Sequence, residues 1–299
     1  MLPIKSMKDF NPLKPGDRLR VITPSGALRE SERFQAGIEI WRSRGYQIEL
    51  SAGYDRQWGY LGGNDQHRQG QLAEAFNDPD CRGILCSRGG YGATRLLEGW
   101  QYTPQLPPKY LIGFSDITAL LWGLNQSIIG VHGPVLTTLA QEPDWSIQRL
   151  FDWVNGRSLS ALKGIGWGGG QVQGWLFPGN LTVATCLLGT PYQPNLTDAI
   201  LAFEDVNEEP YRIDRMLTQW RMVGAFQGVR GIALGRFSQW EKNINSNSFK
   251  VEEVLRDRLG DLNIPIVSDL PFGHDGCNAV LPVGVKVDLD GDRGQLSFT

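Results

Sequence analysis

The stretch 108–124 changes its hydrophobic period from that of a strand to that of a helix. Tyr110 to Phe114 is a short apolar run with the length of a buried strand. From Asp116 onward the apolar residues recur at helical spacing, at Ile117, Leu120, Leu121 and Leu124. Ser115 stands at the switch between the two periods. A chain that contains such a junction is expected to fold as an α/β protein with strands followed directly by helices.

Two interpretations of Ser115 are open at this point. A serine at a sharp strand-to-helix turn is lifted out of the sheet beside the N–H groups of the helix, as in a nucleophile elbow. The local pattern, Gly113-Phe-Ser-Asp-Ile117, lacks the second glycine of G-x-S-x-G. The other interpretation is an ordinary helix N-cap, with Asp116 favouring the first turn.

Composition narrows the functional class. The 299 residues are 41% hydrophobic and 20% charged, with a formal net charge of −3, which is ordinary for a globular protein and favours no nucleic-acid partner. No apolar run reaches about 18 residues, so no membrane partner is expected, and residues 1–10 do not resemble a secretory signal. Four scattered cysteines, without CxxC spacing, indicate buried thiols in a reducing, cytoplasmic compartment.

Strands and helices alternate in two halves of the chain. Between residues 17 and 134 the order is strand, helix, strand, which predicts a parallel sheet with crossover helices. The character of the chain changes over residues 141–173, where Pro143-Asp-Trp145 and Gly164 to Gly170 are loop-like. Gly168-Gly-Gly170 marks a crossover between domains. We therefore predict an α/β fold with a parallel-sheet domain at 1–160 and a smaller α/β domain at 161–299, which closes with a hairpin over 285–298.

A glycine-rich loop follows the predicted strand over 81–88. Its sequence is Arg88-Gly-Gly-Tyr-Gly92, which matches neither a P-loop nor G-x-G-x-x-G. Such a loop can present unobstructed backbone N–H groups to an oxyanion or a carboxylate. It can equally be a tight turn that only glycine makes.

Acid and base candidates stand at two other strand ends. Glu204 and Asp205 close an apolar run that begins at Ala199, and ligands of open α/β sheets gather at such ends. The chain has three histidines. His274 lies in a glycine-flanked loop after a strand, whereas His67 is expected on a solvated helix position and His132 in a structural, hydrogen-bonded role.

Nucleophile, acid and base thus follow one another in the chain as serine, glutamate and histidine. A serine hydroxyl needs a base, and the imidazole needs a carboxylate that holds its tautomer. The tetrahedral oxyanion needs N–H donors, for which we predict the backbone of Asp116 and of the loop at Gly90. Few histidines argue against a metal site, and no cofactor is expected.

Four segments together resemble the LD-carboxypeptidase family of serine peptidases, which includes the murein tetrapeptide carboxypeptidases and a microcin-C immunity branch. They are Gly113-Phe-Ser-Asp116, Arg88-Gly-Gly-Tyr-Gly92, the run from Phe203 to Arg215, and Pro271-Phe-Gly-His274. The resemblance spans nearly the whole chain. It implies a glutaminase-like N-terminal domain and a C-terminal domain that supplies the acid and the histidine, with the site in the cleft between them.

The resemblance also implies roles for residues. Ser115 would be the nucleophile, His274 the general base and then acid, and Glu204 the group that orients it, with Asp205 and Glu208 as rivals. Candidates for substrate binding are Arg88, Tyr91 and Arg212. The implied substrate is a muropeptide, cleaved between the L-centre of diaminopimelate and the terminal D-alanine during cell-wall recycling. A homodimer is implied as well.

Two other functions stay open. The microcin-immunity branch would use the same three residues on an aminoacyl-nucleotide, and the loop aromatics Trp58, Tyr60 and Trp240 could serve as its base platform. A non-catalytic α/β protein could instead bind a peptide or a sugar in the same place.

Overall fold

The computed structural model describes residues 11–100, 106–240 and 248–298. The chain divides into two compact units, the first comprising Met1–Arg157 with Val280–Val283 and the second Ser158–Ala279 with Gly284–Thr299. The predicted division into 1–160 and 161–299 did not include the return of 280–283 to the first unit. There β12 (Leu281–Pro282) pairs antiparallel with β5 (Ile128–His132).

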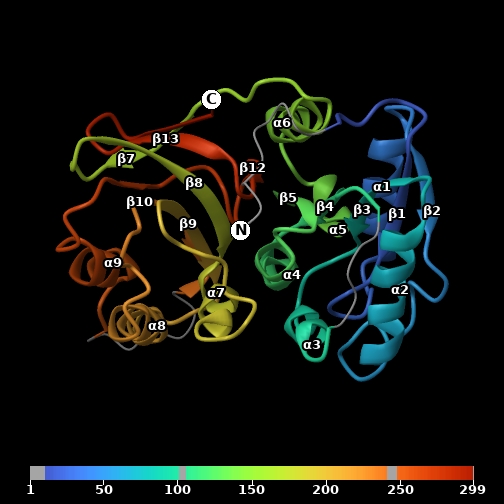
Figure 1. Ribbon diagram of the computed structural model, residues 1–299, viewed down its shortest axis with the longest axis horizontal. Helices are drawn as coiled ribbons and strands as arrows, with labels where there is room; N and C mark the ends of the chain where they lie inside the picture. Colours follow the sequence, from blue (N-terminus) through green and yellow to red (C-terminus); the bar gives the residue numbers. More distant parts are fainter. Residues whose placement is uncertain (1–10, 101–105, 241–247, 299) are drawn as a thin grey trace. The chain divides into compact units, whose positions relative to one another are not determined.

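The first unit is built on a sheet of strand order β12-β5-β4-β3-β1-β2 in the described part of the chain (Figure 1). All neighbours from β5 to β2 are parallel, as predicted. Its remaining strands are β1 (Arg18–Ile22), β2 (Gln47–Leu50), β3 (Cys81–Cys86) and β4 (Lys109–Gly113). Every residue of β4 is buried, which agrees with the apolar run that predicted it.

Two sets of helices in this unit each pack among themselves. α1 (Ser31–Arg42) packs on α5 (Leu136–Leu139), and Gly37 permits the close approach, because a Cβ there would lie 2.1 Å from the Leu136 carbonyl oxygen. The second set comprises α2 (Asp65–Asn77), α3 (Ala93–Leu97) and α4 (Thr118–Gly123). The 3₁₀ turn η2 (Ser115–Ile117) leads from β4 into α4.

The second unit holds a mixed sheet of order β6-β14-β13-β8-β9-β10-β11-β7 in the described residues. Its parallel centre comprises β8 (Gln171–Asn180), β9 (Ala199–Val206), β10 (Gly231–Ser238) and β11 (Ile266–Ser268). β13 (Lys286–Asp290) and β14 (Gln295–Phe298) form the closing hairpin that the sequence predicted. Helices α7 (Leu181–Leu187), α8 (Pro210–Met222) and α9 (Val251–Leu259) pack side by side along it (Figure 1).

The prediction that Pro143-Asp-Trp145 is loop-like was wrong, because Asp144 and Trp145 begin a helix. Residues 141–173 contain this helix, α6 (Asp144–Val154), and the short strands β6 (Leu162–Lys163) and β7 (Ile165–Gly166). α6 buries Ile147, Leu150 and Val154 at helical spacing. Pro143 is the N-cap residue and lies just before the helix begins. No helix among the described residues is long and apolar enough to cross a membrane.

Candidate active site

Ser115 follows the carboxyl end of β4 in a backbone conformation that serine rarely adopts. Its φ is +60°, in the left-handed region, and the helical turn η2 begins with it. This conformation costs a residue with a Cβ about 1 kcal/mol or more, so the fold must hold it in place. A sharp turn of this kind, with the side chain half-buried, is the geometry expected of a nucleophile elbow.

The glycine-rich loop lies directly against Ser115. A Cβ on Gly89 would lie 3.0 Å from the Ser115 Cβ and 3.2 Å from its Oγ, so only glycine leaves the hydroxyl accessible from this side. Gly90 has a φ of +117°, which side chains disfavour. The Gly26 N–H donates to the Gly89 carbonyl oxygen at 3.3 Å, and this hydrogen bond holds the loop against the segment at Gly26.

The Asp116 side chain ties the elbow to this loop. Its Oδ2 accepts from Ser25 Oγ at 2.5 Å and from the Ala93 N–H at 2.7 Å, just after the glycines. Burial raises the pKa of Asp116, and these two hydrogen bonds oppose that shift. With its carboxylate bound there, Asp116 keeps only its backbone N–H beside Ser115. Neither this N–H nor that of Gly90 donates to an acceptor in residues 11–100, 106–240 and 248–298.

A methyl group on Gly89 should therefore displace the Ser115 hydroxyl. We expect Gly89→Ala to lower kcat/KM by about tenfold or more for a reaction in which Ser115 Oγ attacks the substrate, because the displaced hydroxyl loses its attack geometry. The matched control is Gly70→Ala in α2, where a Cβ meets nothing within 4 Å. That control should keep full activity and gain about 0.5–1 kcal/mol in free energy of unfolding, measured in urea. Equal activity of the two variants would contradict this account of Gly89.

Glu204 and His274 form a close pair in the second unit. Glu204 is fully buried at the end of β9, and its Oε2 lies 2.5 Å from His274 Nδ1. A carboxylate only accepts, so Nδ1 carries the hydrogen and Nε2 is left as the basic nitrogen. Burial alone would lower the pKa of His274, but the charge and hydrogen bond of Glu204 outweigh it and raise this pKa.

The two rival carboxylates are engaged elsewhere. Asp205 accepts from Asn180 Nδ2 at 2.9 Å and, through its other oxygen, from the N–H and Oγ1 of Thr182 at 2.9 and 2.8 Å, so it holds the start of α7. Burial and the neighbouring charge of Glu204 raise the pKa of Asp205 to about 6. Glu208 faces Arg212 at 3.9 Å. Of the three carboxylates considered, Glu204 is the one that contacts His274.

Asn180 is a residue of this site that sequence reasoning missed. It is the N-cap of α7, where its side-chain oxygen accepts from the Val183 N–H at 3.2 Å. Its Nδ2 also lies 3.3 Å from Glu204 Oε1, because the parallel register of β8 and β9 sets Asn180 opposite Glu204. A sequence signal for Asn180 existed, because an asparagine at the end of a strand and just before a helix is a typical N-cap.

The remaining candidates lie in different surroundings. Arg88 and Tyr91 flank the glycine loop in the first unit and line a pocket with Gly90. Arg212 is exposed on α8, where its Nε donates to Tyr211 Oη at 3.2 Å. His132 is fully buried in β5, and the half-buried His67 ring lies 3.1 Å from the Gly53 carbonyl oxygen. His67 is therefore less solvated than predicted.

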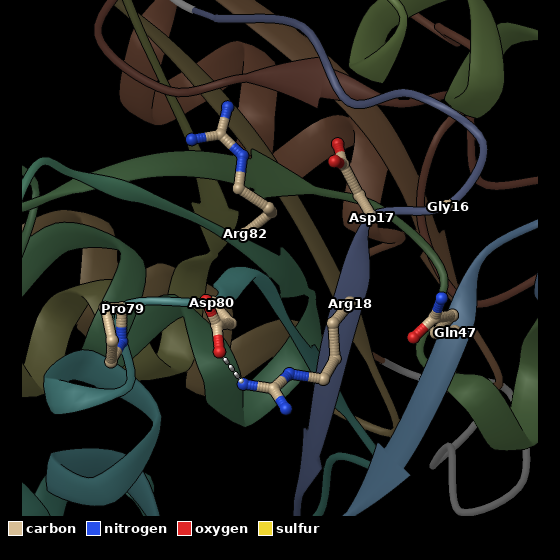
Figure 2. A pocket seen from close by; sticks show the side chains of 7 residues that line it. All are labelled: Gly16, Asp17, Arg18, Gln47, Pro79, Asp80 and Arg82. Atoms are coloured by element: carbon tan, nitrogen blue, oxygen red, sulfur yellow. Dashed lines mark hydrogen bonds and ion pairs between the residues drawn. The ribbon is translucent and has the colours of Figure 1, made fainter.

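A second pocket of the first unit, about 400 Å³ in volume, lies at the amino ends of the strands of its sheet (Figure 2), whereas Ser115 lies at the carboxyl ends. It is lined at the amino ends of β1, β2 and β3, where Arg18 donates to Asp80 at 3.1 Å and to Asp78 at 2.8 Å. Ser115 instead follows the carboxyl end of a parallel strand. In open α/β sheets, ligands bind outside the carboxyl ends of the strands. In the described ranges, no group of three or more histidine, cysteine or acidic residues is placed to hold a metal ion.

Comparison with known proteins covers both units. Residues 19–133 match the model of the LD-carboxypeptidase N-terminal domain, and residues 173–289 match that of the C-terminal domain. A Synechocystis sp. protein, provisionally named a carboxypeptidase, is 58% identical over 96% of each chain. The murein tetrapeptide carboxypeptidase of Pseudomonas aeruginosa is 30% identical over 92% of this chain and 94% of its own.

Solved structures agree in fold. The crystal structure of muramoyltetrapeptide carboxypeptidase from Oxalobacter formigenes has a TM-score of 0.81 and 29% identity, over 93% of this chain and 97% of that one. The structure of MccF in complex with glutamyl sulfamoyl guanosine has a TM-score of 0.83, but its 22% identity, over 99% and 98% of the chains, supports the fold alone. The two domain models and the extent of these matches show that the chain belongs to the LD-carboxypeptidase family.

Proposed function

We propose that this carboxypeptidase-family member is a serine peptidase that removes the terminal D-alanine from murein tetrapeptides. The observation that carries the proposal is the Glu204–His274 hydrogen bond, which leaves His274 Nε2 as a base. The positive φ of Ser115 and its contact with Gly89 support it from the first unit. In this proposal Ser115, Glu204 and His274 are the catalytic triad.

In the first step Ser115 Oγ attacks the carbonyl carbon of the scissile bond. His274 Nε2 takes the hydroxyl proton, and Glu204 stabilises the imidazolium that forms. The carbonyl oxygen becomes an oxyanion, to which the N–H groups of Asp116 and Gly90 donate. Because Asp116 Oδ2 binds the Ala93 N–H, the two donor segments are held in fixed positions before substrate arrives.

In the second step the imidazolium returns the proton to the departing amine. The C–N bond breaks, D-alanine leaves, and the acyl group remains on Ser115 as an ester. A water molecule then gives a proton to His274 Nε2 while its oxygen attacks the ester carbonyl carbon. The C–O bond to Ser115 breaks, the imidazolium returns the proton to Ser115 Oγ, and the tripeptide leaves with a free carboxylate. Every proton transfer uses side chains of this chain, so the proposed reaction needs no metal ion or cofactor.

The choice of a muropeptide rests on relatives whose names state that substrate. They are the Pseudomonas aeruginosa protein and the Oxalobacter formigenes structure, both nearly full-length matches. The Escherichia coli microcin C7 self-immunity protein MccF also matches over 96% of this chain, at 24% identity. Its substrate class is thus the alternative that the experiment must distinguish.

The test is incubation of the protein with L-Ala-γ-D-Glu-mDap-D-Ala and, separately, with an aminoacyl-sulfamoyl adenosine. We expect the tetrapeptide to yield tripeptide and D-alanine by mass spectrometry, at a rate at least about a hundredfold above that for the nucleotide. Faster cleavage of the nucleotide would establish the alternative. Binding of the tetrapeptide without cleavage would show a non-catalytic binding protein.

A further inference from the structure

A pocket of about 370 Å³ lies beside the glycine loop, within the first unit. Its lining comes from three segments of the chain and consists of Gly26, Arg29, Tyr60, Arg88, Gly90 and Tyr91. The lining contains two arginines and no carboxylate, so the pocket is suited to an anion. Arg29 had no role in the sequence analysis, and Tyr60 was considered there only as part of a platform for a nucleotide base.

The side chains of the two arginines differ in the partners that they contact. Arg88 Nη1 donates to the Ala27 carbonyl oxygen at 2.7 Å and lies 3.5 Å from Glu30 Oε2, so its charge is partly balanced. Arg29 is exposed, and among the residues that the structure describes no carboxylate forms an ion pair with its side chain. Arg29 therefore supplies the uncompensated positive charge of the pocket, and Arg88 supplies a fixed donor.

The glycines keep the pocket open above the Arg88 guanidinium. A Cβ on Gly26 would lie 3.4 Å from Arg88 Nε and 3.1 Å from the Gly89 carbonyl oxygen. Tyr60 and Tyr91 stand at the side with ring centroids 5.8 Å apart, and each is more than half exposed. Small apolar groups can contact these rings while an anion meets the arginines.

The pocket lies close to Ser115, because adjacent residues of the glycine loop line the pocket and contact Ser115. Gly90 lines the pocket, and its neighbour Gly89 is in contact with Ser115. In the tetrapeptide, the D-alanine carboxylate is fewer bonds from the scissile carbonyl than any other carboxylate. The D-alanine carboxylate is therefore the substrate anion that can bind closest to Ser115.

We propose that this pocket binds the free C-terminal carboxylate of the leaving residue, with Arg29 as the residue that sets carboxypeptidase specificity and Arg88 as its partner. The inference rests on the proposed function, since it takes its ligand from that reaction. Charge-assisted hydrogen bonds from guanidinium groups to a carboxylate are among the strongest in proteins, so loss of Arg29 should weaken recognition of the free terminus.

The experiment compares the tetrapeptide with its C-terminal D-alanine amide in wild type, Arg29→Gln and Arg29→Lys. We expect Arg29→Gln to lower kcat/KM for the free acid by about tenfold or more, mainly through KM, and to leave the amide unchanged. Arg29→Lys should recover part of the loss, because it keeps the charge. Arg33→Gln on α1 is the matched control, an exposed arginine outside the pocket, and should change neither substrate.

A second readout separates this inference from the proposed function. Calorimetry measures binding of the acid and the amide to Ser115→Ala, with and without Arg29→Gln. An acid preference that depends on Arg29 supports the inference even if the wild type cleaves nothing, a result that would overturn only the peptidase proposal. If the wild type cleaves the tetrapeptide but Arg29→Gln affects acid and amide alike, or neither, the pocket assignment is wrong and the peptidase stands. Failure of both cleavage and acid-selective binding overturns both.

Discussion

Replacing Ser115 with alanine is expected to lower kcat for tetrapeptide hydrolysis by about 10⁶-fold, because no hydroxyl remains to form the acyl-enzyme. His274→Ala should cause a loss of similar size. The double variant should be no worse than either single variant, since the two side chains serve one step. The measurement is single-turnover release of D-alanine, followed by mass spectrometry. A double variant with multiplied losses would show that the two residues do not act as a unit.

The backbone of Ser115 supplies an independent control. At φ +60°, glycine should relieve the strain that serine and alanine share. We therefore expect Ser115→Gly to raise the free energy of unfolding by about 1 kcal/mol relative to Ser115→Ala, with both variants inactive. Urea unfolding curves measure this difference. Inactive variants of unreduced stability would show that the loss is chemical and does not arise from misfolding.

Much of the fold could be predicted because its signals are local. The run from Tyr110 to Phe114 predicted β4, and the helical spacing after it predicted α4. The helix α6 was missed because Pro143 and the glycines after residue 163 dominated the interpretation of 141–173. The return of 280–283 to the first sheet could not be predicted, since the two residues of β12 carry no periodicity.

The residues of the candidate site could be located from the sequence, but their pairing could not. Strand ends located Glu204 and the loop of His274, but three carboxylates lay within reach in the sequence. Only the fold shows that Asp205 is committed to Thr182 and Asn180, which leaves Glu204 for the histidine. Ser25 was likewise invisible, because its partner Asp116 is distant in the sequence. Sequence patterns locate strand ends, whereas side-chain pairing across strands depends on register.

Replacing Glu204 with glutamine should lower kcat by about 10⁴-fold and also move the acid limb of the pH–rate profile. The amide can donate to His274 Nδ1, which favours the tautomer whose Nε2 carries the proton and cannot act as a base. In the wild type the Glu204 carboxylate raises the pKa of His274 against the effect of burial. Activity should therefore fall below a pH that is higher than the ordinary histidine value of about 6.5.

Without the carboxylate, burial acts on His274 with less opposition, so its pKa decreases and the residual activity persists to lower pH than in the wild type. The matched control is Glu208→Gln, which alters the carboxylate that faces Arg212 and should leave the acid limb in place. The profile of kcat/KM between pH 4 and 9 distinguishes the two carboxylates. A loss of rate in Glu204→Gln with an unmoved acid limb would mean that His274 is not the titrating base. A shift in Glu208→Gln alone would transfer the orienting role to Glu208.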